Sequence, residues 1–225
     1  MFCHKCGSQV PDGATACPSC GAVVVAPSVA AVAAHRVEAA SKDAWRAFKL
    51  FLPNPVPGLP AAFESLGEKR ALSAGITFGA VFTLCLLLAA YRVVPDWNRP
   101  SGVMGFIRML LVAAAPALSL FAASVLVRKA FGGEGGFADD SFISGASCLP
   151  LGCVALLAAI FGPGNMQLIT PCALFAGCLT ILMLFGALTR IGKISERGAT
   201  LAVPLILIAT TWLSKLTYLA LLKNS

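Results

Sequence analysis

Five long apolar runs occupy most of the chain beyond residue 70, and charged residues gather between them. Each run is close to the roughly 20 residues that an α-helix needs to cross the hydrocarbon core of a bilayer. The predicted spans are 71–91, 102–127, 142–161, 167–189 and 199–222. The pattern therefore predicts an all-α polytopic membrane bundle of five transmembrane helices over residues 71–222.

The segment 41–70, before the first span, alternates apolar and charged positions at helical spacing. Trp45, Phe48 and Phe51 recur three residues apart, and Lys and Arg residues occupy much of the remaining surface. This spacing predicts a short amphipathic helix at the membrane interface; the alternative is a helix that packs on protein. Four prolines are expected to break this helix, and a second helical patch over 61–70 leads into the first span. These prolines are Pro53, Pro55, Pro57 and Pro60.

The composition agrees with a membrane protein. Hydrophobic residues make up 58% of the chain and charged residues 12%, whereas soluble proteins have roughly 45–50% and about 25%. A soluble core of this size does not hide so many apolar side chains. The numbers exclude a soluble enzyme domain, a disordered tail and a collagen-like fibre.

The net charge of +7 comes from Lys and Arg residues that flank the spans rather than from a separate basic patch. One side of the predicted bundle has Arg36, Lys42, Arg46, Lys49, Lys69, Arg70, Arg128, Lys129, Arg190, Lys193 and Arg197. The other side has Arg92, Arg99, Arg108 and Lys223. Because basic residues concentrate on the cytoplasmic side of membrane proteins, we expect the N-terminus in the cytoplasm and the C-terminus outside.

Residues 1–21 contain two cysteine pairs, Cys3-x-x-Cys6 and Cys17-x-x-Cys20, each followed by glycine. Two thiolates three positions apart in a tight turn can both point at one tetrahedral ion, and the glycine relieves the turn. The spacing predicts a minimal zinc ribbon with one structural Zn²⁺ held by Cys3, Cys6, Cys17 and Cys20. The alternatives are two disulfides, and a ligand role for His4. Residues 22–40 follow as an Ala/Val-rich linker of undecided helical content.

The predicted spans contain no Asp, Glu or His. The spans therefore lack the side chains that a proton relay, a carboxylate-bound metal or an intramembrane protease would use. We expect no enzyme activity. Small residues at Gly75-x-x-x-Gly79 and Ala173-x-x-x-Gly177 predict close helix packing.

The loop between the second and third predicted spans is Gly-rich, with acidic residues at Glu134, Asp139 and Asp140. These predict a capped start of the third span, since Asp suits a helix N-terminus. A divalent-cation site is the alternative.

Five spans, the phrase from Phe131 to Phe137 (Phe-Gly-Gly-Glu-Gly-Gly-Phe), and a following span that contains Pro150 resemble the YIP family of five-pass membrane proteins. The resemblance covers about residues 44–222. Bacterial members of that family often carry an N-terminal zinc ribbon, so the resemblance implies a bacterial cytoplasmic (inner) membrane protein. Eukaryotic relatives are implicated in vesicle traffic, and the family supplies no catalytic residues.

These features together favour a non-enzymatic inner-membrane anchor or adaptor whose cytoplasmic ribbon binds a protein partner. The alternative is a small-solute transporter or channel formed by the five-helix bundle. The ribbon has only Lys5 against Asp12, too little positive charge to neutralise phosphates, so we do not expect nucleic acid as a partner. The lipid bilayer is an expected partner, and homo-oligomerisation through the bundle stays open.

Overall fold

The computed structural model describes residues 2–3, 5–11, 16–22, 29–94 and 101–223. The chain divides into two compact units, Met1–Ala39 and Ala40–Ser225. The first contains the cysteine module and the second contains the long apolar helices. Arg99 and His4, which the sequence placed beside a span and inside the first cysteine pair, lie outside the described residues.

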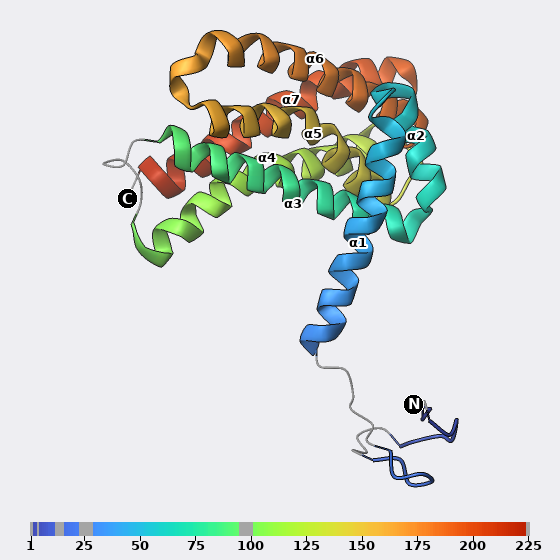
Figure 1. Cartoon of the computed structure of the whole chain (residues 1–225). Helices are drawn as coiled ribbons and strands as arrows, with labels where there is room; N and C mark the ends of the chain where they lie inside the picture. The colour runs from blue at the N-terminus through green and yellow to red at the C-terminus, as the bar shows by residue number, and fades with distance from the viewer. Residues whose placement is uncertain (1, 4, 12–15, 23–28, 95–100, 224–225) are drawn as a thin grey trace. The chain divides into compact units, whose positions relative to one another are not determined.

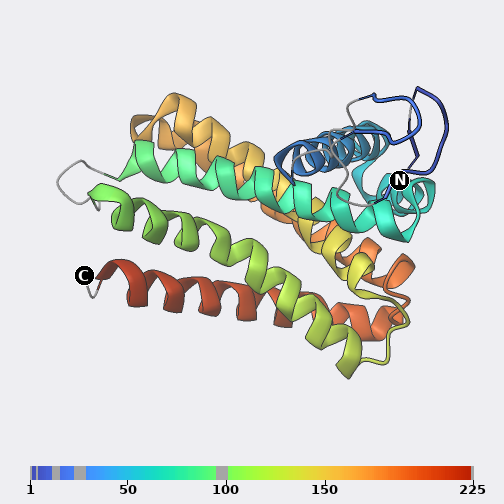
Figure 2. The same ribbon diagram turned by 90° about the horizontal axis from the view of Figure 1, so that it is seen from below.

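Among the described residues of the second unit, five helices are long and apolar enough to cross a membrane. They follow one another in antiparallel succession and run side by side (Figures 1 and 2). These helices are α3 (Glu68–Val93), α4 (Gly102–Ala130), α5 (Phe137–Phe161), α6 (Met166–Arg190) and α7 (Glu196–Tyr218), the last continued by a π-helical turn (Leu219–Lys223). The prediction of an all-helical bundle with five spans is confirmed.

Helices α5 and α6 are joined by a very short turn. Gly162 has a φ of 72° and is followed by a single 3-10 turn, Pro163–Asn165. The Asn165 side chain donates a hydrogen bond of 2.9 Å to the carbonyl of Phe161. This turn contains no charged residue.

Helices α3 and α5 make the closest contact in the bundle, through two glycines. A Cβ added at Gly75 would collide with the backbone of Ser141 on α5, and a Cβ added at Gly145 would collide with the Gly75 carbonyl. Backbones can approach this closely only where side chains are absent. The packing prediction is thus confirmed for Gly75, but Gly79 and Gly177 have nothing within 4 Å of a Cβ position and do not form such a contact.

Two helices precede the spans, α1 with 23 residues and α2 with 12. Helix α1 (Val29–Phe51) begins twelve residues before Ser41, within the segment that the sequence assigned to a linker. The Ala-rich composition of this stretch explains the early start, because alanine has the highest helix propensity. The predicted break is present, because α1 ends at Phe51, before Pro53. Helix α2 (Pro55–Leu66) then begins among these prolines, six residues before the second helical patch expected at 61–70. Pro55 and Pro57 are accepted there because they stand in the first turn, where backbone N–H groups have no helical partner.

In the core of the second unit, aromatic rings of α1 and α2 pack against rings of the spans. Phe51 of α1 lies edge-on to Phe78 of α3, with ring centroids 5.9 Å apart. Phe142 of α5 lies 6.1 Å from Phe78 and 5.5 Å from Phe63 of α2. Ala44, Ala47 and Phe51 are the buried residues of α1. The amphipathic helix therefore does pack on protein, through one of its faces.

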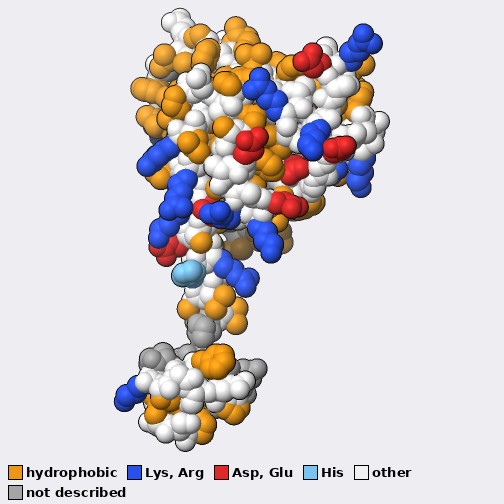
Figure 3. Space-filling view, turned by 90° about the vertical axis from the view of Figure 1, so that its right-hand side faces the viewer, with side chains coloured by type: hydrophobic (Ala, Val, Ile, Leu, Met, Phe, Trp, Pro, Cys, Tyr) orange, Lys and Arg blue, Asp and Glu red, His pale blue; other side chains and the backbone are white. Residues whose placement is uncertain are grey.

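One end of the bundle, called here the charged end, brings together the starts of α3, α5 and α7 and the ends of α4 and α6. Charged side chains gather on this face of the second unit (Figure 3). Arg128, in the last turn of α4, forms a buried ion pair with Asp140 of α5; its Nη2 lies 2.8 Å from Asp140 Oδ2. Glu134 and Lys193 form an exposed pair at 3.2 Å. The α4–α5 loop and the α6–α7 loop also contact each other at this end. A Cβ on Gly133 of the first loop would lie 2.7 Å from the Gly192 carbonyl oxygen of the second.

Helix α5 begins at Phe137, five residues earlier than the predicted span. Asp139 accepts a hydrogen bond of 2.8 Å from the Gly136 amide, which confirms the predicted cap. Asp140 is fully buried, so an acidic group does lie within a helix long enough to span the membrane. The helix starts before both aspartates because Arg128 pairs with Asp140, so this carboxylate is accepted inside the helix.

Candidate metal centre

The cysteine module consists of two backbone turns with the same hydrogen-bond pattern. In the first, the Cys3 amide donates to the Ser8 carbonyl (2.9 Å) and the Gly7 amide donates to the Cys3 carbonyl (2.8 Å). In the second, the Cys17 amide donates to the Ala22 carbonyl (2.8 Å) and the Gly21 amide to the Cys17 carbonyl (2.9 Å). Each pair of cysteines is thus presented by one knuckle.

Glycine is required at the turn of each knuckle. Gly7 has a φ of 72° and Gly21 a φ of 66°, in the left-handed region that other residues adopt at a cost. The two glycines let the chain reverse so that both cysteines of a pair face inward. An isolated β-bridge between Phe2 and Gln9 closes the first knuckle.

The four sulfur atoms lie within 4.8 Å of one another. The Cys3 and Cys20 sulfurs are 3.6 Å apart, and so are those of Cys6 and Cys17. A tetrahedral zinc ion with Zn–S bonds of about 2.3 Å places its sulfur ligands about 3.8 Å apart. The four cysteines are free thiols, which favours the metal site over the disulfide alternative.

Ser8 contributes to this site, and the sequence reasoning missed it. Its hydroxyl lies 2.9 Å from the Cys6 sulfur and 3.3 Å from the Cys17 sulfur. The Ser8 hydroxyl, with backbone amides, lowers the pKa of Cys17 to about 6 and also lowers the pKa of Cys6. The sequence could have indicated this role, because Ser8 directly follows Gly7, and a hydroxyl at that position can reach one cysteine of each pair.

Cys20 has the opposite shift. The Ala22 amide lowers its pKa, but hydrogen bonds with Cys6 and the other thiols, together with burial, outweigh this and raise the pKa of Cys20 to about 12. Crowding of four thiols therefore leaves some of them protonated until a cation is bound. A divalent metal compensates the collected negative charge, which is the chemistry of a structural zinc site.

Very little apolar surface is buried around the cysteines. The core of the module consists of Cys3, Val10 and Cys17, with Ala22 packed against it. So small a core does not offset the chain entropy of about twenty residues, so metal binding must supply most of the folding free energy. Phe2 is 75% exposed, leaving an aromatic ring on the surface of the module.

The comparisons with known proteins agree with this geometry. Residues 2–24 match the zinc-ribbon domain family. The N-terminal module is a zinc ribbon. The match extends three residues beyond the predicted end at 21 and covers the ribbon but not the membrane helices. No curated protein and no solved structure matches the chain.

The acidic residues of the 131–141 region do not form the alternative cation site. Asp140 is engaged by Arg128, Asp139 accepts from the Gly136 amide, and Glu134 pairs with Lys193. Glu134 and Asp139 do line one pocket together with Glu64, but Arg190 and Lys193 line it as well. Glu134 and Asp139 already have partners within the protein, and basic side chains in the same pocket oppose a cation. Within the described ranges, the cluster of His, Cys, Asp and Glu side chains suited to a metal is the four cysteines.

Proposed function

We propose that this protein is a non-enzymatic adaptor of a bacterial cytoplasmic membrane, in which the zinc ribbon binds a protein partner and the five-span body anchors it. The likeness to the YIP family supports the membrane assignment. The excess of Lys and Arg at the charged end supports an orientation with the N-terminus in the cytoplasm.

The closed ligand set of the ribbon is the observation that carries the proposal. Four thiolates fill the coordination shell of zinc, so no position is open for a substrate or an activated water. The metal therefore stabilises a shape rather than performing chemistry. That shape belongs to a compact unit separate from the bundle, as a recruiting module requires.

Phe2 is the residue most suited to contact a partner. Exposed aromatic side chains are enriched at protein interfaces and often dominate their binding energy, and Phe2 is 75% exposed next to the first knuckle. Its backbone is held by the bridge to Gln9, so the ring projects from an ordered surface.

Affinity capture from detergent extracts tests the proposal. The full chain is compared with Phe2→Ser, with Phe2→Leu and with a chain that lacks residues 1–22. We expect partners that the full chain and Phe2→Leu retain and that Phe2→Ser and the shortened chain lose. Zinc content, measured by mass spectrometry, should stay at one ion in both Phe2 variants. Identical partners in all four samples would contradict the adaptor role, and solute uptake into liposomes that carry the protein would favour transport.

A further inference from the structure

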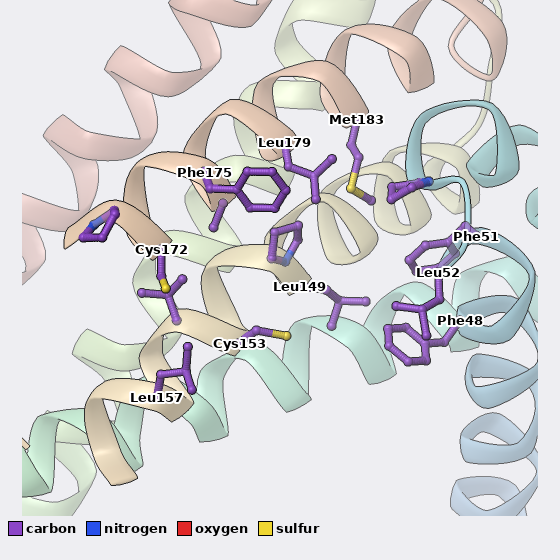
Figure 4. Close-up of a pocket in the computed structure, with 15 residues that line it drawn as sticks. Phe48, Phe51, Leu52, Leu149, Cys153, Leu157, Cys172, Phe175, Leu179 and Met183 are labelled. Carbon is purple, nitrogen blue, oxygen red and sulfur yellow. The ribbon is translucent and has the colours of Figure 1, made fainter. Parts of the chain in front are cut away.

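An apolar groove runs between α1, α5 and α6, with a volume of about 520 Å³. Figure 4 shows Phe48 of α1 and Leu52, just beyond that helix, at one end, and Leu157 and Cys172 toward the other. Its lining side chains are hydrophobic throughout. The stretch from Pro171 to Met183 alone extends about 18 Å at 1.5 Å per residue. The groove is therefore long, narrow and apolar.

A second apolar groove, of about 390 Å³, lies between α1, α3 and α5. The two grooves share Phe48, Leu149 and Cys153, so they meet beneath α1 on either side of α5. Both volumes fall in the range of small-molecule sites, roughly 300–1,000 Å³. The two grooves are therefore adjacent and join each other beside α1.

Both grooves extend from α1 into the membrane-crossing part of the bundle. The residues of α1 in the second unit run across the direction of α3 and α5 (Figures 1 and 2). A helix that crosses the direction of spanning helices lies along the plane of the membrane. The grooves lead from α1 past Leu149, at the middle of α5, toward Leu157 and Cys172, near the end of the bundle opposite the charged end. They are open to lipid, since Phe175 is 71% exposed and Leu52 is 58% exposed.

Helix α1 carries positive charge where the grooves begin. Between residues 40 and 51 it has three basic residues against the single Asp43. Arg46 and Lys49 are exposed, and the Lys49 ammonium lies 5.3 Å from the centre of the Trp45 ring. Trp45 and Phe48 line the second groove, so the Lys49 charge borders the apolar lining. Arg46 lies one turn before residue 49 on the same helix. An aromatic ring beside a lysine is also the arrangement found at the headgroup level of bilayers.

We propose that the two grooves form a binding site for one anionic phospholipid, with an acyl chain in each groove and the phosphate beside Arg46 and Lys49. The apolar lining accepts hydrocarbon, the paired grooves match two chains, and the basic side chains complement a negative headgroup. The site requires neither the ribbon nor a protein partner, so it stands independently of the adaptor role.

Photo-crosslinking in vesicles tests this site. The full-length protein is reconstituted with a trace of phosphatidylglycerol, or in a matched sample phosphatidylcholine, that carries a diazirine in one acyl chain. Labelled peptides are then mapped by mass spectrometry. We expect labelling concentrated on residues that line the grooves, such as Cys153 and Leu157 of α5 and Leu179 of α6, rather than on Leu174. It should be at least about threefold stronger with phosphatidylglycerol, because two nearby basic residues attract the anionic headgroup.

Two pairs of matched variants separate headgroup from acyl-chain recognition. Arg46→Gln/Lys49→Gln should lower phosphatidylglycerol labelling to the phosphatidylcholine level. Lys129→Gln/Arg197→Gln removes the same charge from exposed positions at the charged end that line neither groove, and should change nothing.

Leu157→Trp fills the first groove and should reduce labelling by both lipids, whereas Leu174→Trp, on a lipid-facing position of α6 that lines neither groove, should not. Equal labelling by the two lipids, or labelling as strong around Leu174 as in the grooves, would overturn the proposal. So would crosslinks through Cys153 to a second copy of the chain, which would place protein in the groove.

Discussion

Asp140→Asn tests how strongly a buried ion pair holds the charged end of the bundle together. The Asp140 side chain is completely buried and the Arg128 side chain is 13% exposed. Arg128 Nε lies 3.1 Å and 2.9 Å from the two carboxylate oxygens, and Nη2 lies 2.8 Å from Oδ2. The pair joins the last turn of α4 to the first turn of α5, so it closes the loop between them.

The amide keeps the shape of the side chain but removes its charge. The Arg128 guanidinium then remains almost buried without a counter-ion, which costs about 3–5 kcal/mol when one partner of a buried pair is removed. That loss is large against the roughly 5–15 kcal/mol of stability of a typical domain. Replacing both partners, Asp140→Asn with Arg128→Met, should recover much of the loss, because no uncompensated charge is then buried.

Unfolding in mixed detergent and SDS micelles, followed by tryptophan fluorescence, measures these differences. Glu134→Gln is the matched control, since its pair with Lys193 is 3.2 Å long but both side chains are mostly exposed, and such pairs contribute about 1 kcal/mol or less. A loss for Asp140→Asn no larger than that for Glu134→Gln would refute the argument. Absence of coupling in the Asp140/Arg128 double-mutant cycle would also refute it.

Three further predictions concern the helix contact and the ribbon. Gly75→Ala should destabilise the bundle in the same unfolding assay because its Cβ meets the backbone of α5, whereas Gly79→Ala, with open space, should be neutral or slightly stabilising. Cys17→Ser should abolish zinc binding and unfold the ribbon while the spans stay inserted, as zinc analysis, circular dichroism of residues 1–25 and protease protection of vesicles would report. Cobalt affinity should fall as the pH is lowered from 8 to 5, because the metal needs thiolates: Cys20, with its raised pKa, releases a proton on binding, and Cys17 remains a thiolate down to about pH 6. Visible absorption of the cobalt–thiolate complex measures this, and an affinity independent of pH would contradict it.

The features that the sequence predicted well are those that depend on residue type and local spacing. The length of an apolar run decides whether a helix can span a bilayer, so the number of spans was predictable. Cysteine spacing in a tight turn determines which sulfurs can share an ion. Gly75 was identifiable as a candidate contact, but Gly79 has the same local spacing, and only the neighbouring helix distinguishes them.

The features that were missed depend on contacts between distant residues. Asp140 lies within a spanning helix because Arg128, on a different helix, compensates its charge. Ser8 matters because the fold brings Cys17 next to it. Pro55 and Pro57 were interpreted as breakers without the helix boundary that makes them acceptable. Residue propensities describe one residue in isolation. Asp140 and Ser8 depend instead on a distant partner, and Pro55 and Pro57 depend on their position in the first turn of a helix.

The short turn between α5 and α6 has a consequence for how the protein enters the membrane. From Ser141 to Thr189 the chain contains no charged residue, so neither helix nor their Gly162–Asn165 connection brings an ionised group through the hydrocarbon. In the orientation proposed above, Arg92 in the last turn of α3 and Asp96 and Arg99 after it must instead cross the membrane. Each charge costs about 2.5–3.5 kcal/mol at the bilayer centre. Helices α5 and α6 can therefore insert together as one hairpin during biosynthesis, while the α3–α4 pair depends on the translocation machinery for passage of its loop.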